Sequence, residues 1–138
     1  MSVSAMRSAL ALVLAVAAAA VPVGAGSRVT DVTVEQAHEL ILKQSGKSDF
    51  VILDVRTPAE FREGHIEGAV LLDISAPEFE TRVSALDRGK TYLVYCRTGN
   101  RSLRAVQTME RLGFRSIYHM NQGIVGWQQK KLPLSRPS

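Results

Sequence analysis

The sequence predicts an α/β fold, a doubly wound and mostly parallel sheet of about five strands flanked by helices. Short apolar runs alternate along the chain with segments whose apolar residues recur every three or four positions, which is typical of strands alternating with helices. The run 50–53 is apolar at every position, as expected of a strand that is buried on both faces of a parallel sheet. We therefore expect helices on both sides of the sheet.

Capping residues set the expected limits of several elements. Thr33 and Gln36, and again Thr57 and Glu60, have the spacing of a capping box, and Pro58 is tolerated at a first helical position. Strands are expected at 28–32, 50–53, 70–72, 93–95 and 116–119, and helices at 33–44, 57–63, 75–86, 102–112 and 124–130.

The helix 102–112 has a clear apolar repeat. Leu103, Val106, Met109 and Leu112 recur every three positions, so we expect them to form its buried face. In the last helix, Trp127 is expected to anchor the core.

Residues 1–25 have the pattern of a secretory signal peptide. Arg7 precedes an unbroken apolar run from Ala9 to Val21, and small residues follow that suit a cleavage site. The apolar run is shorter than the roughly 20 residues of a membrane span. We expect cleavage at the end of this segment, with cleavage after Ala20 as the alternative.

Residues 26–138 are expected to form one domain, because this length suffices for one core and not for two. The signal peptide predicts that this domain belongs to a periplasmic or secreted protein. The formal net charge of +4 comes without a basic stripe or an aromatic platform, which argues against nucleic-acid binding. Three histidines and one cysteine lack metal-ligand spacing, and no Gly-rich nucleotide loop follows a strand. We expect no metal, no cofactor and no stable membrane span after cleavage.

The single cysteine, Cys96, lies between a predicted strand and a predicted helix. The loop from Cys96 to Arg101 is rich in small and polar residues, so its N–H groups can converge on the sulfur while the helix directs its positive end there. Arg97 and Arg101 add two cations. The carboxyl end of a parallel strand is where α/β folds place ligand sites. We interpret Cys96 as a reactive thiol rather than as a small buried hydrophobe.

Activation of this thiol needs several contributions. A free cysteine with a pKa of about 8.5 is only about 3% thiolate at pH 7, and lowering the pKa by about two units requires about 2.7 kcal/mol. A helix terminus typically supplies about 0.3–1 kcal/mol. The loop amides and at least one arginine must therefore contribute as well.

Three stretches share a likeness to one family. Cys96-Arg97-Thr98-Gly99-Asn100-Arg101-Ser102 joins a strand to a helix, the run 51–61 precedes Gly-His-Ile at 64–66, and Gly123-Ile124-Val125-Gly126-Trp127 lies near the end. They resemble the active-site loop, the strand with its acidic-basic pair and turn, and the closing motif of single-domain rhodaneses, the thiosulfate sulfurtransferase family. The resemblance extends from about Thr30 to Leu132.

The resemblance implies a sulfurtransferase, and the pattern of residues 1–25 adds the expectation that it is exported. Cys96 would take a sulfane sulfur from thiosulfate or a similar small anion, hold it as a persulfide, and give it to cyanide or a thiol, with a protein thiol as a further partner. The substrate-binding positions would be Arg97, Thr98, Gly99, Asn100, Arg101 and Ser102.

Three further residues are expected to support the site. Asp54 and Arg56 emerge at the carboxyl end of the strand 50–53, on the same edge as Cys96. Asp54 is interpreted mainly as half of a structural ion pair, whereas Arg56 is expected to serve both the turn and the anion field. His65, in its Gly-His-Ile turn, is expected to fix the loop rather than to act as a base.

Two other functions remain open. Rhodanese-like domains also occur as sulfur carriers or interaction modules. Cysteine-based phosphatases and arsenate reductases have a similar loop, but with five residues between cysteine and arginine, whereas four separate Cys96 from Arg101. The chain also departs from the rhodanese pattern at Gln122, where glycine is usual, and at Glu67, where proline is frequent.

Overall fold

One parallel sheet forms the centre of the molecule. The structure is a computed structural model that describes residues 28–137. In this part of the chain, five strands follow the order β1-β5-β4-β2-β3, and every neighbouring pair is parallel. Their bounds are β1 Val29–Val32, β2 Phe50–Asp54, β3 Val70–Leu71, β4 Thr91–Tyr95 and β5 Ser116–Met120. The predicted fold class is confirmed, whereas the expected signal peptide lies outside the described residues.

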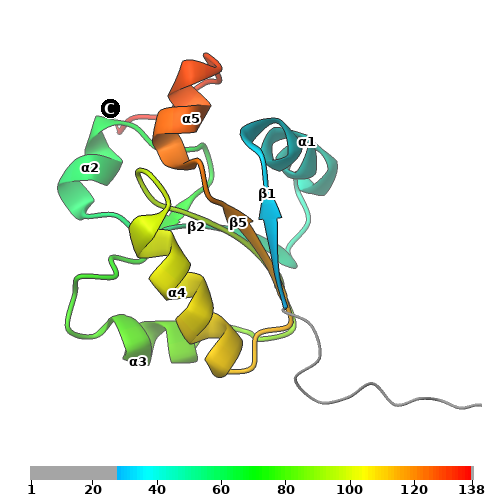
Figure 1. Cartoon of the computed structure of the whole chain (residues 1–138), viewed down its shortest axis with the longest axis vertical. Helices are drawn as coiled ribbons and strands as arrows, with labels where there is room; N and C mark the ends of the chain where they lie inside the picture. Colours follow the sequence, from blue (N-terminus) through cyan, green and yellow to red (C-terminus); the bar gives the residue numbers. More distant parts are fainter. Residues whose placement is uncertain (1–27, 138) are drawn as a thin grey trace, which may run out of the picture.

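Helices cover both faces of this sheet (Figure 1). They are α1 Val34–Gln44, α2 Pro58–Glu63, α3 Phe79–Ser84, α4 Asn100–Arg111 and α5 Gly123–Gln129. Side chains of α3 and α4 share one buried cluster with the sheet, and side chains of α1 and α5 share the other. No helix within residues 28–137 is both long and apolar enough to cross a bilayer.

The two capping boxes begin their helices as predicted. The Thr33 hydroxyl accepts from the Gln36 amide, and the Gln36 side chain accepts from the Thr33 amide. Thr57 and Glu60 make the same reciprocal pair at the start of α2. Each box satisfies N–H groups that a helix start leaves without partners.

The central strand β4 places the cysteine. Tyr92 and Val94 face the α3 and α4 side, while Leu93 and Tyr95 face the α1 and α5 side, because successive side chains of a strand alternate. Cys96 follows directly and belongs to the α4 side. The sulfur therefore lies at the carboxyl end of the middle strand, beneath the start of α4.

The buried face of α4 contains the predicted Val106 and Met109, and Leu112 packs against the same core, but Leu103 does not belong to it. The helix begins at Asn100, two residues earlier than expected, and Leu103 is 48% exposed. The buried residues are Ser102, Ala105, Val106 and Met109. This set has helical spacing, and it includes Ser102, whose hydroxyl contacts the Cys96 sulfur.

Other boundaries also changed, most of all in α3, which is shorter than the predicted 75–86 at both ends. The helix α3 covers only Phe79–Ser84 because Asp73 and Ser75 form a polar turn before it, in which the Ser75 amide and hydroxyl both donate to the Asp73 carboxylate. The strand β3 has two residues rather than three, and β5 is one residue longer than expected.

The orientation of α4 can be tested by truncating one residue on each side. Met109→Ala removes a fully buried side chain and is expected to lower the free energy of unfolding by about 2–5 kcal/mol. Leu103→Ala is expected to change it by less than about 0.5 kcal/mol. Urea unfolding of both variants measures the difference, and equal losses would contradict the observed orientation.

Candidate active site

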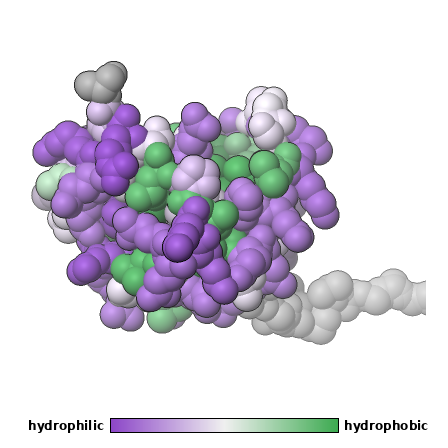
Figure 2. Space-filling view, turned by 90° about the horizontal axis from the view of Figure 1, so that it is seen from above, coloured by the Kyte–Doolittle hydropathy of each residue, from purple (hydrophilic) through white to green (hydrophobic). Residues whose placement is uncertain are grey.

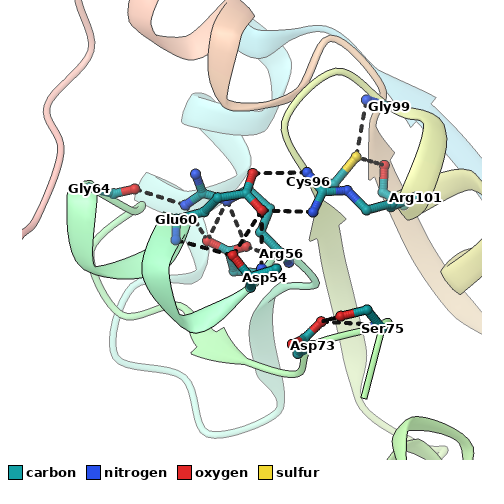
Figure 3. A network of polar contacts seen from close by, with 11 residues as sticks. Asp54, Arg56, Glu60, Gly64, Asp73, Ser75, Cys96, Gly99 and Arg101 are labelled. Atoms are coloured by element: carbon teal, nitrogen blue, oxygen red, sulfur yellow. Dashed lines mark hydrogen bonds and ion pairs between the residues drawn. The ribbon is translucent and has the colours of Figure 1, made fainter. Parts of the chain in front are cut away.

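Hydrogen bonds converge on the Cys96 sulfur from the loop and from α4 (Figure 3). The Gly99 amide donates to Sγ over 3.1 Å, and the Ser102 hydroxyl lies 3.2 Å from the same atom. Cys96 is only 1% exposed. The sulfur is therefore recessed at the first turn of α4, where the positive end of the helix and the loop amides meet.

These hydrogen bonds outweigh the cost of burial. Burial by itself raises the pKa of the Cys96 thiol, since it disfavours the charged form. The Ser102 hydroxyl and the amides of Ser102, Gly99 and Thr98 lower it by more, so the pKa of Cys96 lies below its ordinary value. The arrangement favours a thiolate, which is the nucleophilic form of cysteine.

The turn between β5 and α5 holds the loop in shape. The amides of Ile124 and Val125 donate to the carbonyls of Cys96 and Arg97 over 2.9 and 3.2 Å. With these carbonyls held by α5, amides of the loop remain free to face the sulfur. A side chain at Gly123 would collide with the Arg97 carbonyl, and one at Gly99 with the Asn121 carbonyl. Both glycines also have positive φ, so glycine is favoured at each position by the backbone conformation as well as by the lack of space.

The two arginines of the loop have different surroundings. Arg101 forms a bidentate pair with Glu60 of α2, at 2.8 and 2.9 Å. The hydrogen bonds from Arg101 are the main cause that lowers the pKa of Glu60 to about 2. Arg97 is exposed and lines a cavity of about 370 Å³ together with Arg56, Glu60, Glu63, Gly64, Ile124 and Gln128.

Asp54 and Arg56 form a buried ion pair that supports α2. The Arg56 side chain donates to both Asp54 oxygens, the shortest contact being 2.7 Å, and also to the Gly64 carbonyl. The Tyr95 hydroxyl donates to Asp54 as well, over 2.7 Å. Asp54 thus joins β2 to β4 and to the end of α2, which fixes the position from which Glu60 reaches Arg101.

His65 lies in the turn after α2, away from the sulfur contacts. Its Nδ1–H donates to the Phe61 carbonyl over 2.8 Å, and its ring stacks on Phe61 at 3.6 Å. Its backbone pairs with Ser135 in both directions. These contacts fix the turn and the end of the chain, and the structural role of this histidine stays a prediction.

Sequence reasoning missed part of the site. Glu60 was expected only as a capping residue, yet it also pairs with Arg101. His119 was considered only as a metal ligand, yet its Nε2 lies 2.6 Å from the Ser102 hydroxyl. Knowledge of the strand order would have indicated His119, because β5 lies beside β4 in the sheet. The sequence alone does not give that order.

The departure at Gln122 has a structural explanation. Its side-chain oxygen accepts from the Val34 amide over 3.0 Å. That amide belongs to the first turn of α1 and has no partner within its own helix. The glutamine therefore ties the turn before α5 to the start of α1.

The carboxyl edge is mainly polar on its outside. Figure 2 looks at the end of the molecule toward which the strands point and shows hydrophobic patches among predominantly hydrophilic residues. A larger cavity of about 690 Å³ lies elsewhere, between α1, β2 and the C-terminal segment, and its lining contains none of the predicted site residues.

A parallel α/β sheet with a hydrogen-bonded cysteine at the end of its central strand defines a class of thiolate sites, and comparison with known proteins identifies the family. The model of the rhodanese-like domain matches residues 33–130. The chain therefore belongs to the rhodanese-like family, as its loop and turn motifs predicted.

Individual relatives agree with this assignment. A sulfurtransferase of Allochromatium vinosum is 30% identical over 101 residues, which cover 73% of this chain and 92% of that protein. An uncharacterized protein of Synechocystis is 37% identical over 110 residues, covering 79% of this chain but only 59% of the relative. A rhodanese-related protein of Thermoplasma volcanium has a similar solved structure, with a TM-score of 0.66, 29% identity, and coverage of 78% of this chain and 99% of that one.

The role of Ser102 can be tested by titrating the cysteine. Ser102→Ala removes a hydrogen bond to a charged sulfur, worth about 1.5–3 kcal/mol, so the pKa of Cys96 is expected to rise by about one to two units. The rate of alkylation by iodoacetamide as a function of pH reports this pKa. Thr108→Ala, which removes a hydroxyl further along α4, serves as the control. An unchanged midpoint in Ser102→Ala would contradict the assigned role.

The Glu60–Arg101 pair predicts a pH dependence of stability. Because the folded-state pKa of Glu60 is about 2, below its ordinary value of 4.5, its contribution is present above about pH 4.5 and is lost as the pH falls toward 2. Glu60→Gln should therefore be less stable than the wild type at neutral pH, and this difference should shrink in acid.

Urea unfolding between pH 7 and pH 3 measures that difference. Glu63→Gln removes an exposed carboxylate from the same helix and should show no such trend. A constant gap between the wild type and Glu60→Gln would show that the pair adds nothing to stability.

Proposed function

We propose that this rhodanese-like protein is a sulfurtransferase that moves a sulfane sulfur through a Cys96 persulfide. The observation that carries the proposal is a buried sulfur that accepts from the Gly99 amide and lies within hydrogen-bond distance of the Ser102 hydroxyl. The same groups can stabilise the negative charge of a thiolate and of a persulfide. The names of relatives such as the Allochromatium sulfurtransferase support the same class of reaction.

The proposed reaction has two steps of displacement at sulfur. The Cys96 thiolate attacks the outer sulfur of thiosulfate, so a bond forms between Sγ and that sulfur. The bond between the two donor sulfurs breaks, and sulfite leaves with the electron pair. Cyanide or a thiolate then attacks the outer sulfur of the persulfide and departs with it, which returns the Cys96 thiolate.

The surroundings of the sulfur favour a small anionic donor. Cys96 is almost completely buried, so a bulky donor could not reach Sγ without movement of the loop. Arg97 is exposed at the cavity beside the loop, whereas the guanidinium of Arg101 is engaged by Glu60. We assign the first contact with the donor anion to Arg97. Arg101, whose position is fixed by Glu60, contributes a positive charge near the site.

A sulfur carrier is the second candidate, because a carrier needs the same persulfide. An enzyme turns over many donor molecules, whereas a carrier takes up one sulfur for each chain and releases it to a partner thiol. Phosphatase and arsenate reductase chemistry is less favoured, since the loop has only four residues between Cys96 and Arg101.

We also propose that the protein is exported to the periplasm or secreted. The support is the pattern of residues 1–25, with one early arginine and a long apolar run before small residues. Residues 26–138 would then be the mature domain, with Cys96 as its one thiol.

The proposal predicts the outcome of treatment with thiosulfate. The protein should gain the mass of one sulfur atom, and Cys96→Ser should gain none and lose all transfer to cyanide. Arg97→Gln should keep the persulfide but raise KM for thiosulfate several-fold, because one exposed charge contact is lost. Intact-mass spectrometry and thiocyanate formation measure these changes.

Three results would change the assignment. A sulfur adduct that persists in Cys96→Ser would overturn it. A single stoichiometric transfer without turnover would favour the carrier. Hydrolysis of an aryl phosphate that depends on Cys96 would favour the phosphatase alternative.

A further inference from the structure

A line of polar atoms leads from the reactive sulfur to the surface of the protein. The Ser102 hydroxyl lies 3.2 Å from the Cys96 sulfur and 2.6 Å from Nε2 of His119. Nδ1 of His119 lies 3.4 Å from a carboxylate oxygen of Asp31. The four side chains come from the end of β4, from α4, from β5 and from β1, so only the folded sheet brings them together.

The register of the sheet explains this alignment. Asp31 pairs with His119 across β1 and β5, and Val94 pairs with His119 across β4 and β5. Ser102 lies above them on the buried face of α4. The His119 side chain is 3% exposed, whereas that of Asp31 is 66% exposed. The line therefore begins in the core and ends at a solvated carboxylate.

We propose that His119 is a positioning residue that accepts the proton leaving Cys96, with the Ser102 hydroxyl passing it on and the Asp31 carboxylate stabilising the imidazolium. The proposal rests on the proposed function only in that it describes how the nucleophile is formed. The loop amides stabilise the thiolate, and His119 is the group that takes up the proton of the thiol.

The proposed transfer moves two protons, each from the donor to the acceptor of one hydrogen bond, so that every bond that breaks is matched by one that forms. In the thiol state, Cys96 donates to Ser102, Ser102 donates to Nε2 of His119, and Nδ1–H of His119 donates to Asp31. The S–H bond breaks as a new O–H bond forms on Ser102, and the original O–H bond of Ser102 breaks as an N–H bond forms on Nε2. The products are a thiolate that accepts from Ser102 and an imidazolium beside Asp31, with no change in total charge.

The charges around His119 fit this role. Burial lowers the pKa of His119 by more than Asp31 raises it, so the ring is neutral before the transfer, and the Asp31 carboxylate offsets part of the cost of the charged form. Asp31 faces the ring from β1, and the Cys96 sulfur at the end of β4 reaches it through Ser102 on α4. Val94, its register neighbour on β4, is apolar.

A purely structural histidine would need only to hold the Ser102 hydroxyl. Glutamine can also accept a hydrogen bond from that hydroxyl, but it cannot take up a proton at neutral pH. His119→Gln therefore separates positioning by a hydrogen bond from acceptance of the proton. Asp31→Asn, at an exposed position, provides a second variant whose folding is not at risk.

The test is the pH profile of Cys96 alkylation by iodoacetamide in the full chain. His119→Gln should move the midpoint up by about one unit, which corresponds to about a tenfold slower reaction below the midpoint. Asp31→Asn should move the midpoint in the same direction by a smaller amount. His38→Gln, on α1 against Trp127, should leave it unchanged.

A nuclear magnetic resonance titration of the His119 ring nitrogens provides an independent reading. Replacing Cys96 by alanine should lower the pKa of His119, since the thiolate that stabilises the imidazolium is gone. The relay would be overturned if the alkylation midpoint were unchanged in both His119→Gln and Asp31→Asn, or if the pKa of His119 were the same in Cys96→Ala as in the wild type. Iodoacetamide carries no sulfane sulfur, so these results do not depend on whether thiosulfate loads the protein.

Discussion

The convergence of the Gly99 amide and the Ser102 hydroxyl on the Cys96 sulfur is the interaction on which the site depends. A sulfur that is 1% exposed would resist ionisation if burial acted alone. Several hydrogen bonds must therefore contact the sulfur at the same time, held in a fixed geometry, to stabilise its charged form. The fold meets this need by ending the central strand at Cys96 and beginning α4 immediately after the loop.

Rigidity of the loop comes from parts of the chain that are distant in sequence. The first amides of α5 hold the loop carbonyls, and Gly99 and Gly123 allow the two turns to touch. On the other side, the Asp54–Arg56 pair fixes α2, and α2 supplies the carboxylate that holds Arg101. A buried ion pair of this kind does more for geometry than for net stability, because the cost of desolvation offsets much of the attraction.

The sequence predicted the features that local chemistry determines. Both capping boxes, the strand that leads to Cys96 and the loop after it follow from residues close to one another, so spacing alone was informative. It placed Val106 and Met109 correctly on the inward face of α4 but placed Leu103 there wrongly, because an apolar repeat gives no signal that the polar Ser102 faces inward. It also missed His119, whose contact with Ser102 depends on β5 lying between β1 and β4. Partners across a sheet require the strand order, which no short motif contains.

The most direct test of this account is the absorbance of the thiolate near 240 nm in the wild-type protein as the pH rises. Cys96 is the one cysteine of the chain, and burial raises the pKa of Tyr92 and Tyr95, which delays their ionisation. We predict a transition with a midpoint below about 8.5, the value of a free cysteine, that precedes the ionisation of Tyr92 and Tyr95 and is lost in Cys96→Ser. A midpoint at or above that value would contradict the claim that the loop and Ser102 hold the sulfur in its anionic form.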